Sequence, residues 1–81
     1  MKISYSPKFK ELLKELPYDV QQKLYKQAGF LKNDIRHPSL RSKKYGGRED
    51  LWQARVDRNV RFYFEIQNDT ITLLSIKKHP K

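Results

Sequence analysis

Two arginines and a histidine carry the chemistry that the sequence suggests. Arg55 and Arg61 flank a predicted turn at residues 57–59, and His79 follows the last apolar run. A guanidinium donates paired hydrogen bonds to phosphate oxygens, and an imidazole transfers protons near neutral pH. Cleavage of a phosphodiester without a metal needs cations that stabilise the phosphorane and a group that moves protons. We therefore predict that the catalytic residues are Arg61, His79 and Arg55.

Further basic residues are clustered along the chain. Residues 36–48 contain five basic side chains and no acidic one, and three of the last five residues are lysines. The whole chain holds 18 Lys and Arg against 9 Asp and Glu, a formal net charge of +9. Such clustering is typical of proteins that bind the phosphate backbone of nucleic acids, and no strong amphipathic anchor indicates a membrane surface instead. The residues predicted to hold phosphates are Arg41, Lys43, Lys44, Arg48, Lys77 and Lys78.

Several other chemistries are disfavoured. The chain has no cysteine, which excludes thiolate metal sites, a cysteine nucleophile and a disulfide scaffold. Two histidines and scattered acidic residues do not favour a zinc or two-metal centre, and no glycine-rich phosphate loop or serine nucleophile motif is present. His37, in the basic segment, could contribute to catalysis as well. We expect neither a metal nor another cofactor.

Length and hydropathy bound the organisation. Eighty-one residues suffice for one small domain, so we expect a single domain over residues 1–81. No stretch approaches the ~18 apolar residues of a membrane span, and the first residues lack the apolar segment of a secretion signal. We therefore expect a cytoplasmic protein that does not contact a membrane.

The pattern of apolar residues predicts an α+β fold. A short strand precedes Ser6-Pro7, which should begin a helix, and Pro17 should end that helix and open a second one that stops near residues 33–38. Residues 37–50 indicate a loop with a short edge strand near 40–45. Strand-like runs at 51–56, 60–66 and 70–76 follow. These elements predict a strand, a helical hairpin and an antiparallel meander whose apolar face the helices cover.

The alternation of apolar residues predicts the register of the meander. A three-residue loop at 57–59, with Asn59 in the left-handed region, places two faces in register. The predicted pairs are Trp52 with Phe64, Ala54 with Phe62 and Val56 with Val60 on the apolar face, and Arg55 with Arg61 and Gln53 with Tyr63 on the other. A two-residue turn at 68–69 pairs Glu65 with Thr72 and Arg61 with Ile76. Facing arginines repel each other, and an anion bound between them would offset that cost.

Six segments share their order and spacing with a known family. They are Tyr5-Ser6-Pro7-Lys8-Phe9, Leu13-Lys14-Glu15-Leu16-Pro17, His37-Pro38-Ser39-Leu40-Arg41, Leu51-Trp52-Gln53-Ala54-Arg55-Val56, Val60-Arg61-Phe62-Tyr63-Phe64 and Leu73-Leu74-Ser75-Ile76. Over nearly the whole chain they resemble the RelE/ParE superfamily of type II toxins, and in particular its RelE-like mRNA interferase branch. The resemblance implies a small toxin made with a protein antitoxin, and a fold like the one predicted above.

For the RNase branch, the resemblance also implies a reaction. Such toxins enter the ribosomal A site and cut mRNA, with the substrate's 2′-hydroxyl as nucleophile and a 2′,3′-cyclic phosphate and a 5′-hydroxyl as products. By resemblance, Arg61 stabilises the phosphate, Arg55 is a second basic residue, and His79 stands where RNase members keep an arginine or histidine. Lys43 and Lys44 match the basic loop that grips RNA. The implied partners are a cognate antitoxin, mRNA and the ribosome.

Two alternatives remain open at this point. The family's gyrase-inhibiting branch shares the fold and needs no catalytic group. A homologue that binds RNA or antitoxin but has lost cleavage is the other alternative, because the loop glutamate and late tyrosine of family members have no counterpart here. His79 close to Arg61 favours the RNase interpretation.

Overall fold

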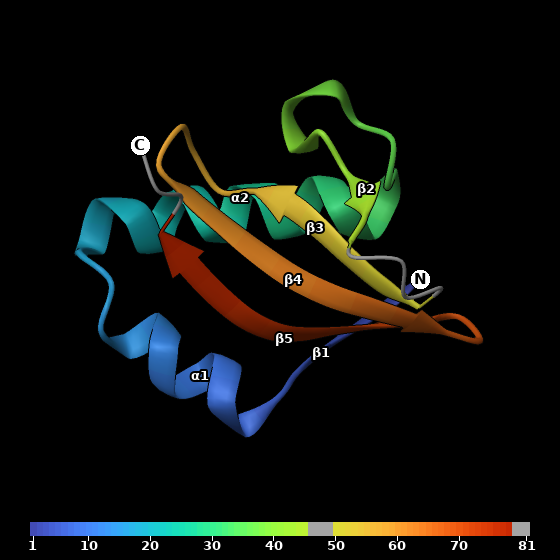
Figure 1. The fold of residues 1–81 in the computed structure, drawn as a ribbon, viewed down its shortest axis with the longest axis horizontal. Helices are drawn as coiled ribbons and strands as arrows, with labels where there is room; N and C mark the ends of the chain where they lie inside the picture. The colour runs from blue at the N-terminus through green and yellow to red at the C-terminus, as the bar shows by residue number, and fades with distance from the viewer. Residues whose placement is uncertain (46–49, 79–81) are drawn as a thin grey trace.

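A five-stranded sheet and two helices make up the part of the chain that the computed structural model describes, residues 1–45 and 50–78 (Figure 1). The elements are β1 (Lys2–Tyr5), α1 (Pro7–Lys14), α2 (Tyr18–Asn33), the 3₁₀ turn η1 (Pro38–Leu40), β2 (Lys43–Lys44), β3 (Leu51–Arg55), β4 (Val60–Gln67) and β5 (Thr70–Lys78). This order confirms the predicted α+β fold class. The short edge strand expected near residues 40–45 is β2, preceded by η1.

Side-chain hydrogen bonds cap the start of α1 and connect its end to α2. The Ser6 hydroxyl accepts the N–H of Phe9 at 3.1 Å and so caps the start of α1. At the other end, the side-chain amide of Gln21 donates to the carbonyls of Leu13 at 2.9 Å and Leu16 at 3.1 Å. Helix ends leave several carbonyls without an intrahelical partner. One glutamine of α2 therefore satisfies the end of α1 and fixes the helical hairpin.

The sheet has the strand order β1-β5-β4-β3-β2. β1 runs parallel to β5, and the other neighbours are antiparallel. The predicted register of β3 and β4 is confirmed. The observed pairs include Trp52 with Phe64, Gln53 with Tyr63, Ala54 with Phe62 and Arg55 with Arg61. The three-residue loop closes this hairpin, since Val56 donates its N–H to the carbonyl of Val60 at 2.9 Å.

The predicted pairing of Arg61 with Ile76 is wrong. Glu65 does pair with Thr72, but the register shifts between Tyr63 and Phe64, and Arg61 lies opposite Lys77. The shift leaves Leu74 without a partner, as in a β-bulge. Two core-facing residues of β5 explain the shift. Leu73 and Ile76 are both buried although they are three positions apart, an odd spacing that would put them on opposite faces of a regular strand, so an extra residue is needed to turn both toward the core.

The predicted left-handed backbone of Asn59 is also wrong. Asp57 shapes this loop instead, because its carboxylate accepts the N–H groups of Asn59 at 2.8 Å and Val60 at 2.9 Å. Among the described residues other than glycine, positive φ occurs at Asn68 (57°), in the next turn, and at Arg41 (48°).

The core lies between the helices and one face of the sheet. Phe9 of α1 and Leu24 of α2 are fully buried, as are Phe62 and Phe64 of β4. All belong to one apolar cluster, which confirms that both helices cover the same face. In Figure 1, α2 passes behind β3 and β4, and neither α-helix of the described ranges covers the opposite face, here called the open face. Neither helix is long and apolar enough to cross a membrane.

Candidate functional site

Basic side chains from several strands meet on the open face. Arg61 of β4 lies between Arg55 of β3 and Lys77 of β5 in the register. Lys43 of β2 and Arg41, the residue after η1, extend this row. A cavity of ≈ 370 Å³, here called the basic cavity, is lined by Arg41, Lys43, Gln53, Arg55 and Arg61. A second cavity, of ≈ 400 Å³, shares Arg41 with it. The fold thus brings together four of the residues predicted to be catalytic or phosphate-binding.

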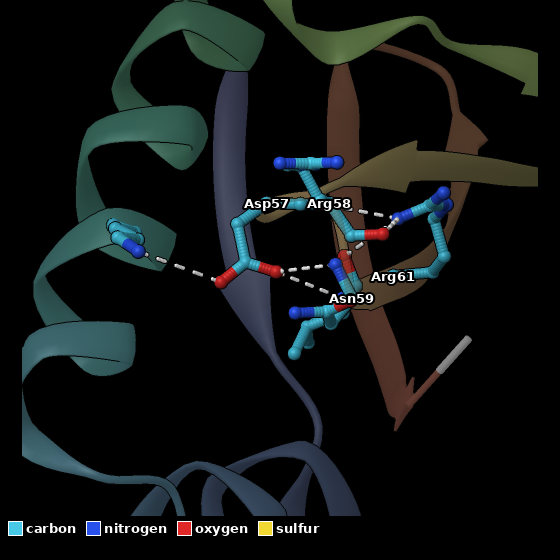
Figure 2. Close-up of polar contacts among 6 residues, drawn as sticks. Asp57, Arg58, Asn59 and Arg61 are labelled. Atoms are coloured by element: carbon cyan, nitrogen blue, oxygen red, sulfur yellow. Dashed lines mark hydrogen bonds and ion pairs between the residues drawn. The ribbon is translucent and has the colours of Figure 1, made fainter. Parts of the chain in front are cut away.

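Arg61 is held by the backbone of the loop between β3 and β4. Its side chain is only 7% exposed, which is unusual for a charged residue. Figure 2 shows its guanidinium directed at the loop carbonyls: Nη1 donates to the carbonyls of Asp57 at 2.8 Å, Arg58 at 3.3 Å and Val60 at 3.3 Å. Within residues 1–45 and 50–78, no hydrogen bond uses its Nε or Nη2. One nitrogen therefore fixes the guanidinium, and the other two have no hydrogen-bond partner among the described residues.

Asp57 keeps those carbonyls in place. Besides accepting two backbone N–H groups of the loop, its carboxylate lies 3.6 Å from the Nζ of Lys23, which belongs to α2 (Figure 2). The loop is therefore tied to the helix layer as well as to its own backbone. A fixed loop presents fixed carbonyls, so Asp57 orients Arg61 without touching it through its side chain.

A buried glutamine positions the other side of the basic cavity. Gln27 of α2 is 6% exposed, and its side-chain amide donates to the carbonyls of Ser39 at 3.1 Å and Arg55 at 3.0 Å. Its carbonyl oxygen accepts the Ser39 hydroxyl at 3.1 Å. Gln27 thus ties η1 to the end of β3, and Arg41 follows η1 directly. This residue could have been found from sequence, since it is a polar residue on the apolar stripe of α2.

The charges of the basic cavity are not neutralised by its own lining. No carboxylate belongs to the described lining. Partial desolvation, and then the charges of three neighbouring arginines, lower the pKa of Arg55 below its ordinary value. Those arginines are Arg41, Arg61 and Arg58. Repulsion of this kind favours a bound anion, and guanidinium groups match the paired oxygens of a phosphate.

Two tyrosines border the basic row. The rings of Tyr45 and Tyr63 meet edge to face at 5.0 Å, and Lys77 places its Nζ 5.7 Å from the centre of the Tyr63 ring. Desolvation, and then Tyr45, raise the pKa of Tyr63, so its phenol stays protonated at neutral pH. The predicted register already placed Tyr63 on this face. Sequence reasoning did not identify Tyr45. It lies two residues after Lys43, the spacing that places side chains of an extended strand on the same face.

Other predicted phosphate-binding residues lie elsewhere. Lys44 follows Lys43 in an extended strand and therefore points to the opposite face, where its Nζ lies 5.9 Å from the Trp52 ring. Lys78 lines a different cavity beside α1. Arg48 and His79 fall outside the residues that the structure describes, so their predicted roles remain predictions. In the described ranges, no three residues among His, Cys, Asp and Glu gather closely enough to hold a metal ion.

Comparisons with known proteins identify the fold. No family and no curated protein matches by sequence. RelE in the RelE-RelB complex of Pyrococcus horikoshii has a TM-score of 0.80 at 17% identity, over 95% of this chain and 92% of that one. YoeB from Staphylococcus aureus has a TM-score of 0.78 at 14% identity, over 99% of this chain and 98% of that one. Isolated E. coli RelE has a TM-score of 0.78 at 13% identity, over 99% of this chain and 85% of that one. The predicted resemblance to the RelE/ParE superfamily is confirmed at the level of the fold.

Proposed function

We propose that this chain, which has the RelE/ParE toxin fold, is the toxin of a toxin–antitoxin pair and cleaves mRNA on the ribosome. The observation that carries the proposal is the basic cavity. Two of its guanidiniums, those of Arg55 and Arg61, lie on neighbouring strands of the sheet, and its described lining contains no acidic residue. Preorganised cations of this kind stabilise charge that develops in a transition state.

The proposed reaction uses the substrate's own 2′-hydroxyl. Attack of the 2′-oxygen on the adjacent phosphorus forms a phosphorane, and departure of the 5′-oxygen leaves a 2′,3′-cyclic phosphate and a 5′-hydroxyl. Arg61 offers Nε and Nη2 to the phosphorane oxygens, while Nη1 stays bound to the loop carbonyls. Arg55 lies beside it and stabilises the same charge. Proton transfer is assigned to His79, as predicted from the sequence.

We further propose that a protein antitoxin covers the basic cavity. Similar structures include the RelB-RelE complex of Methanococcus jannaschii (TM-score 0.78, 20% identity, 93% of this chain and 88% of that one). A chain with a net charge of +9 and facing arginines gains from an acidic or amphipathic segment laid over it. Such a segment would block the phosphate site directly.

A second candidate function has its own supporting observation. Neither an imidazole nor a carboxylate belongs to the described lining of the basic cavity, so that part of the site offers cations for a phosphate but no side chain suited to proton transfer. If His79 does not complete the site, the chain is an RNA-binding homologue with weakened cleavage. Such a protein would still bind RNA with strong salt dependence.

Primer extension on an mRNA translated in a reconstituted system tests the proposed function. We expect new 5′ ends within codons when the protein is added, and none with naked mRNA. Supercoiling of plasmid DNA by gyrase is measured alongside. Inhibited supercoiling with intact mRNA would reject the RNase function in favour of gyrase inhibition, and RNA binding without cleavage would support the weakened homologue.

A further inference from the structure

A second cavity shares Arg41 with the basic cavity. Its volume is ≈ 400 Å³, and we call it the Trp52 cavity. Its walls combine flat rings with apolar residues and a second guanidinium: Trp52, His37, Pro38, Ile35, Arg36 and Arg41. Nothing in the proposed cleavage chemistry uses this cavity.

The backbone of Arg41 places this residue between the two cavities. It has φ 48° and ψ 46°, the left-handed region, which is unfavourable for a residue with a long side chain. Such conformations persist where the surroundings impose them, and they are frequent at functional sites. Arg41 directly follows η1, which Gln27 ties to α2. Arg41 thus contributes to the walls of both cavities.

The aromatic walls of the Trp52 cavity are preorganised. The His37 ring stacks on Phe30 with centroids 3.8 Å apart and planes 5° apart, and its Nδ1 accepts the N–H of Ser39 at 3.2 Å. Trp52 stacks on Phe64 at 6.1 Å. Rings fixed in this way lose little freedom when another flat group stacks on them.

Polar groups beside these rings suit the edge of a nucleobase. The Ser42 hydroxyl at the cavity wall is buried and has no hydrogen-bond partner within the described ranges. Neutral His37 carries its proton on Nε2, because Nδ1 accepts a hydrogen bond. A ligand with a flat aromatic part and hydrogen-bonding edges matches this wall better than an aliphatic group does.

We propose that the Trp52 cavity binds a nucleobase of the RNA strand whose neighbouring phosphate lies in the basic cavity. The inference rests on the proposed function, because it takes RNA as the occupant of the basic cavity. Arg41 would hold the phosphate that joins the two parts. Base stacking on aromatic and guanidinium surfaces is the usual way in which proteins bind single-stranded RNA.

Tryptophan fluorescence tests this directly, since Trp52 is the only tryptophan of the chain. The full chain is titrated with AMP and, separately, with ribose 5-phosphate, which carries the phosphate without the base. We expect AMP to quench Trp52 and ribose 5-phosphate to leave it unchanged. By competition against a labelled tetranucleotide, AMP should bind about 5- to 150-fold more tightly than ribose 5-phosphate, as expected for one stacked base.

Variants locate the effect. His37→Ala should remove most of the AMP preference and leave ribose 5-phosphate binding unchanged, whereas Lys10→Ala on α1 should change neither. If circular dichroism shows that His37→Ala does not fold, Arg36→Ala, which alters an exposed side chain, is expected to reduce the AMP preference in the same way.

Failure of this inference and failure of the proposed function are distinguishable. RNA binding and cleavage with no quenching, or equal affinity for AMP and ribose 5-phosphate, would overturn the nucleobase site alone. Quenching by AMP without any mRNA cleavage would support the nucleobase site and reject the RNase function. Quenching that N-acetyltyrosinamide reproduces at the same concentration would overturn the proposal and indicate a site for an aromatic side chain of a protein partner.

Discussion

Arg55 and Arg61 are cross-strand neighbours on the open face of the sheet, although both carry a positive charge. Like charges directly opposite each other destabilise an antiparallel pair. The rest of the fold holds them there: Arg61 is fixed by loop carbonyls, and Gln27 binds the carbonyl of Arg55. This arrangement costs stability in the free protein, and an anion bound between the two guanidiniums would offset that cost.

Replacing Arg55 with glutamine should therefore stabilise the free protein while weakening RNA binding. We expect a higher urea midpoint at low salt, because the repulsion with Arg61 disappears, and a smaller gain at high salt, where screening already reduces it. Urea denaturation at two salt concentrations measures this. A lower midpoint at both concentrations would show that Arg55 stabilises the fold and that the repulsion is negligible.

Lys43 and Lys44 provide a matched pair for RNA binding. They are adjacent and equally charged, but only Lys43 lines the basic cavity. Each phosphate contact contributes a slope of roughly -0.7 in log K against log salt for single strands. We expect Lys43→Ala to reduce the slope by about that amount and Lys44→Ala to change it less. Fluorescence anisotropy with a labelled RNA at several salt concentrations is the measurement. Equal effects of the two variants would show that the basic cavity is not the preferred site for phosphates.

Asp57 should affect cleavage without touching RNA. Asp57→Ala removes the acceptor of two backbone N–H groups, which should cost about 1–3 kcal/mol of unfolding free energy and loosen the carbonyls that orient Arg61. Asp57→Asn keeps an acceptor oxygen, so we expect its stability and cleavage rate to stay close to those of the wild type. Thermal denaturation and single-turnover cleavage compare them. An Asn variant as impaired as the Ala variant would assign the effect to the ion pair with Lys23.

Gln27 should act as a positioning residue for the basic cavity. Gln27→Met fills similar volume but leaves the carbonyls of Ser39 and Arg55 without their donor, at an expected cost of about 1–3 kcal/mol. RNA affinity should fall as well, because η1 no longer holds Arg41. Adding Arg41→Ala to Gln27→Met should then cost less affinity than Arg41→Ala does alone. Additive losses of affinity in this double-mutant cycle would show that Gln27 does not act through Arg41.

Local pattern predicted the parts of the fold that depend on neighbouring residues. The register of β3 and β4 follows from alternating side chains and a three-residue loop, and it places Arg55 beside Arg61. The bulge at Leu74 was not predictable, because it depends on how Ile76 meets the helices. The parallel pairing of β1 with β5 joins distant segments, and nothing local selects it.

In the candidate site, too, local pattern predicted some features, and contacts between distant segments decide the others. Arg61 was predicted from its place opposite Arg55, but its burial and its carbonyl partners depend on how Asp57 folds the loop. Lys43 and Lys44 could have been separated by the two-residue period of a strand, had the bounds of β2 been known. The position of Arg41 depends on η1 and on Gln27, a contact between segments twelve residues apart.

Single-turnover cleavage of mRNA on the ribosome by Arg61 variants tests the central claim most directly. Arg61→Ala should lower the rate by ~10²–10³ at every pH, the typical loss when one transition-state cation is removed. Arg61→Lys should recover only part of it, because an ammonium cannot offer a fork of donors to two oxygens. Lys78→Ala, which removes a charge outside the basic cavity, is the matched control. An Arg61→Ala variant that folds and cleaves at the wild-type rate would contradict the assignment of the basic cavity as the catalytic site.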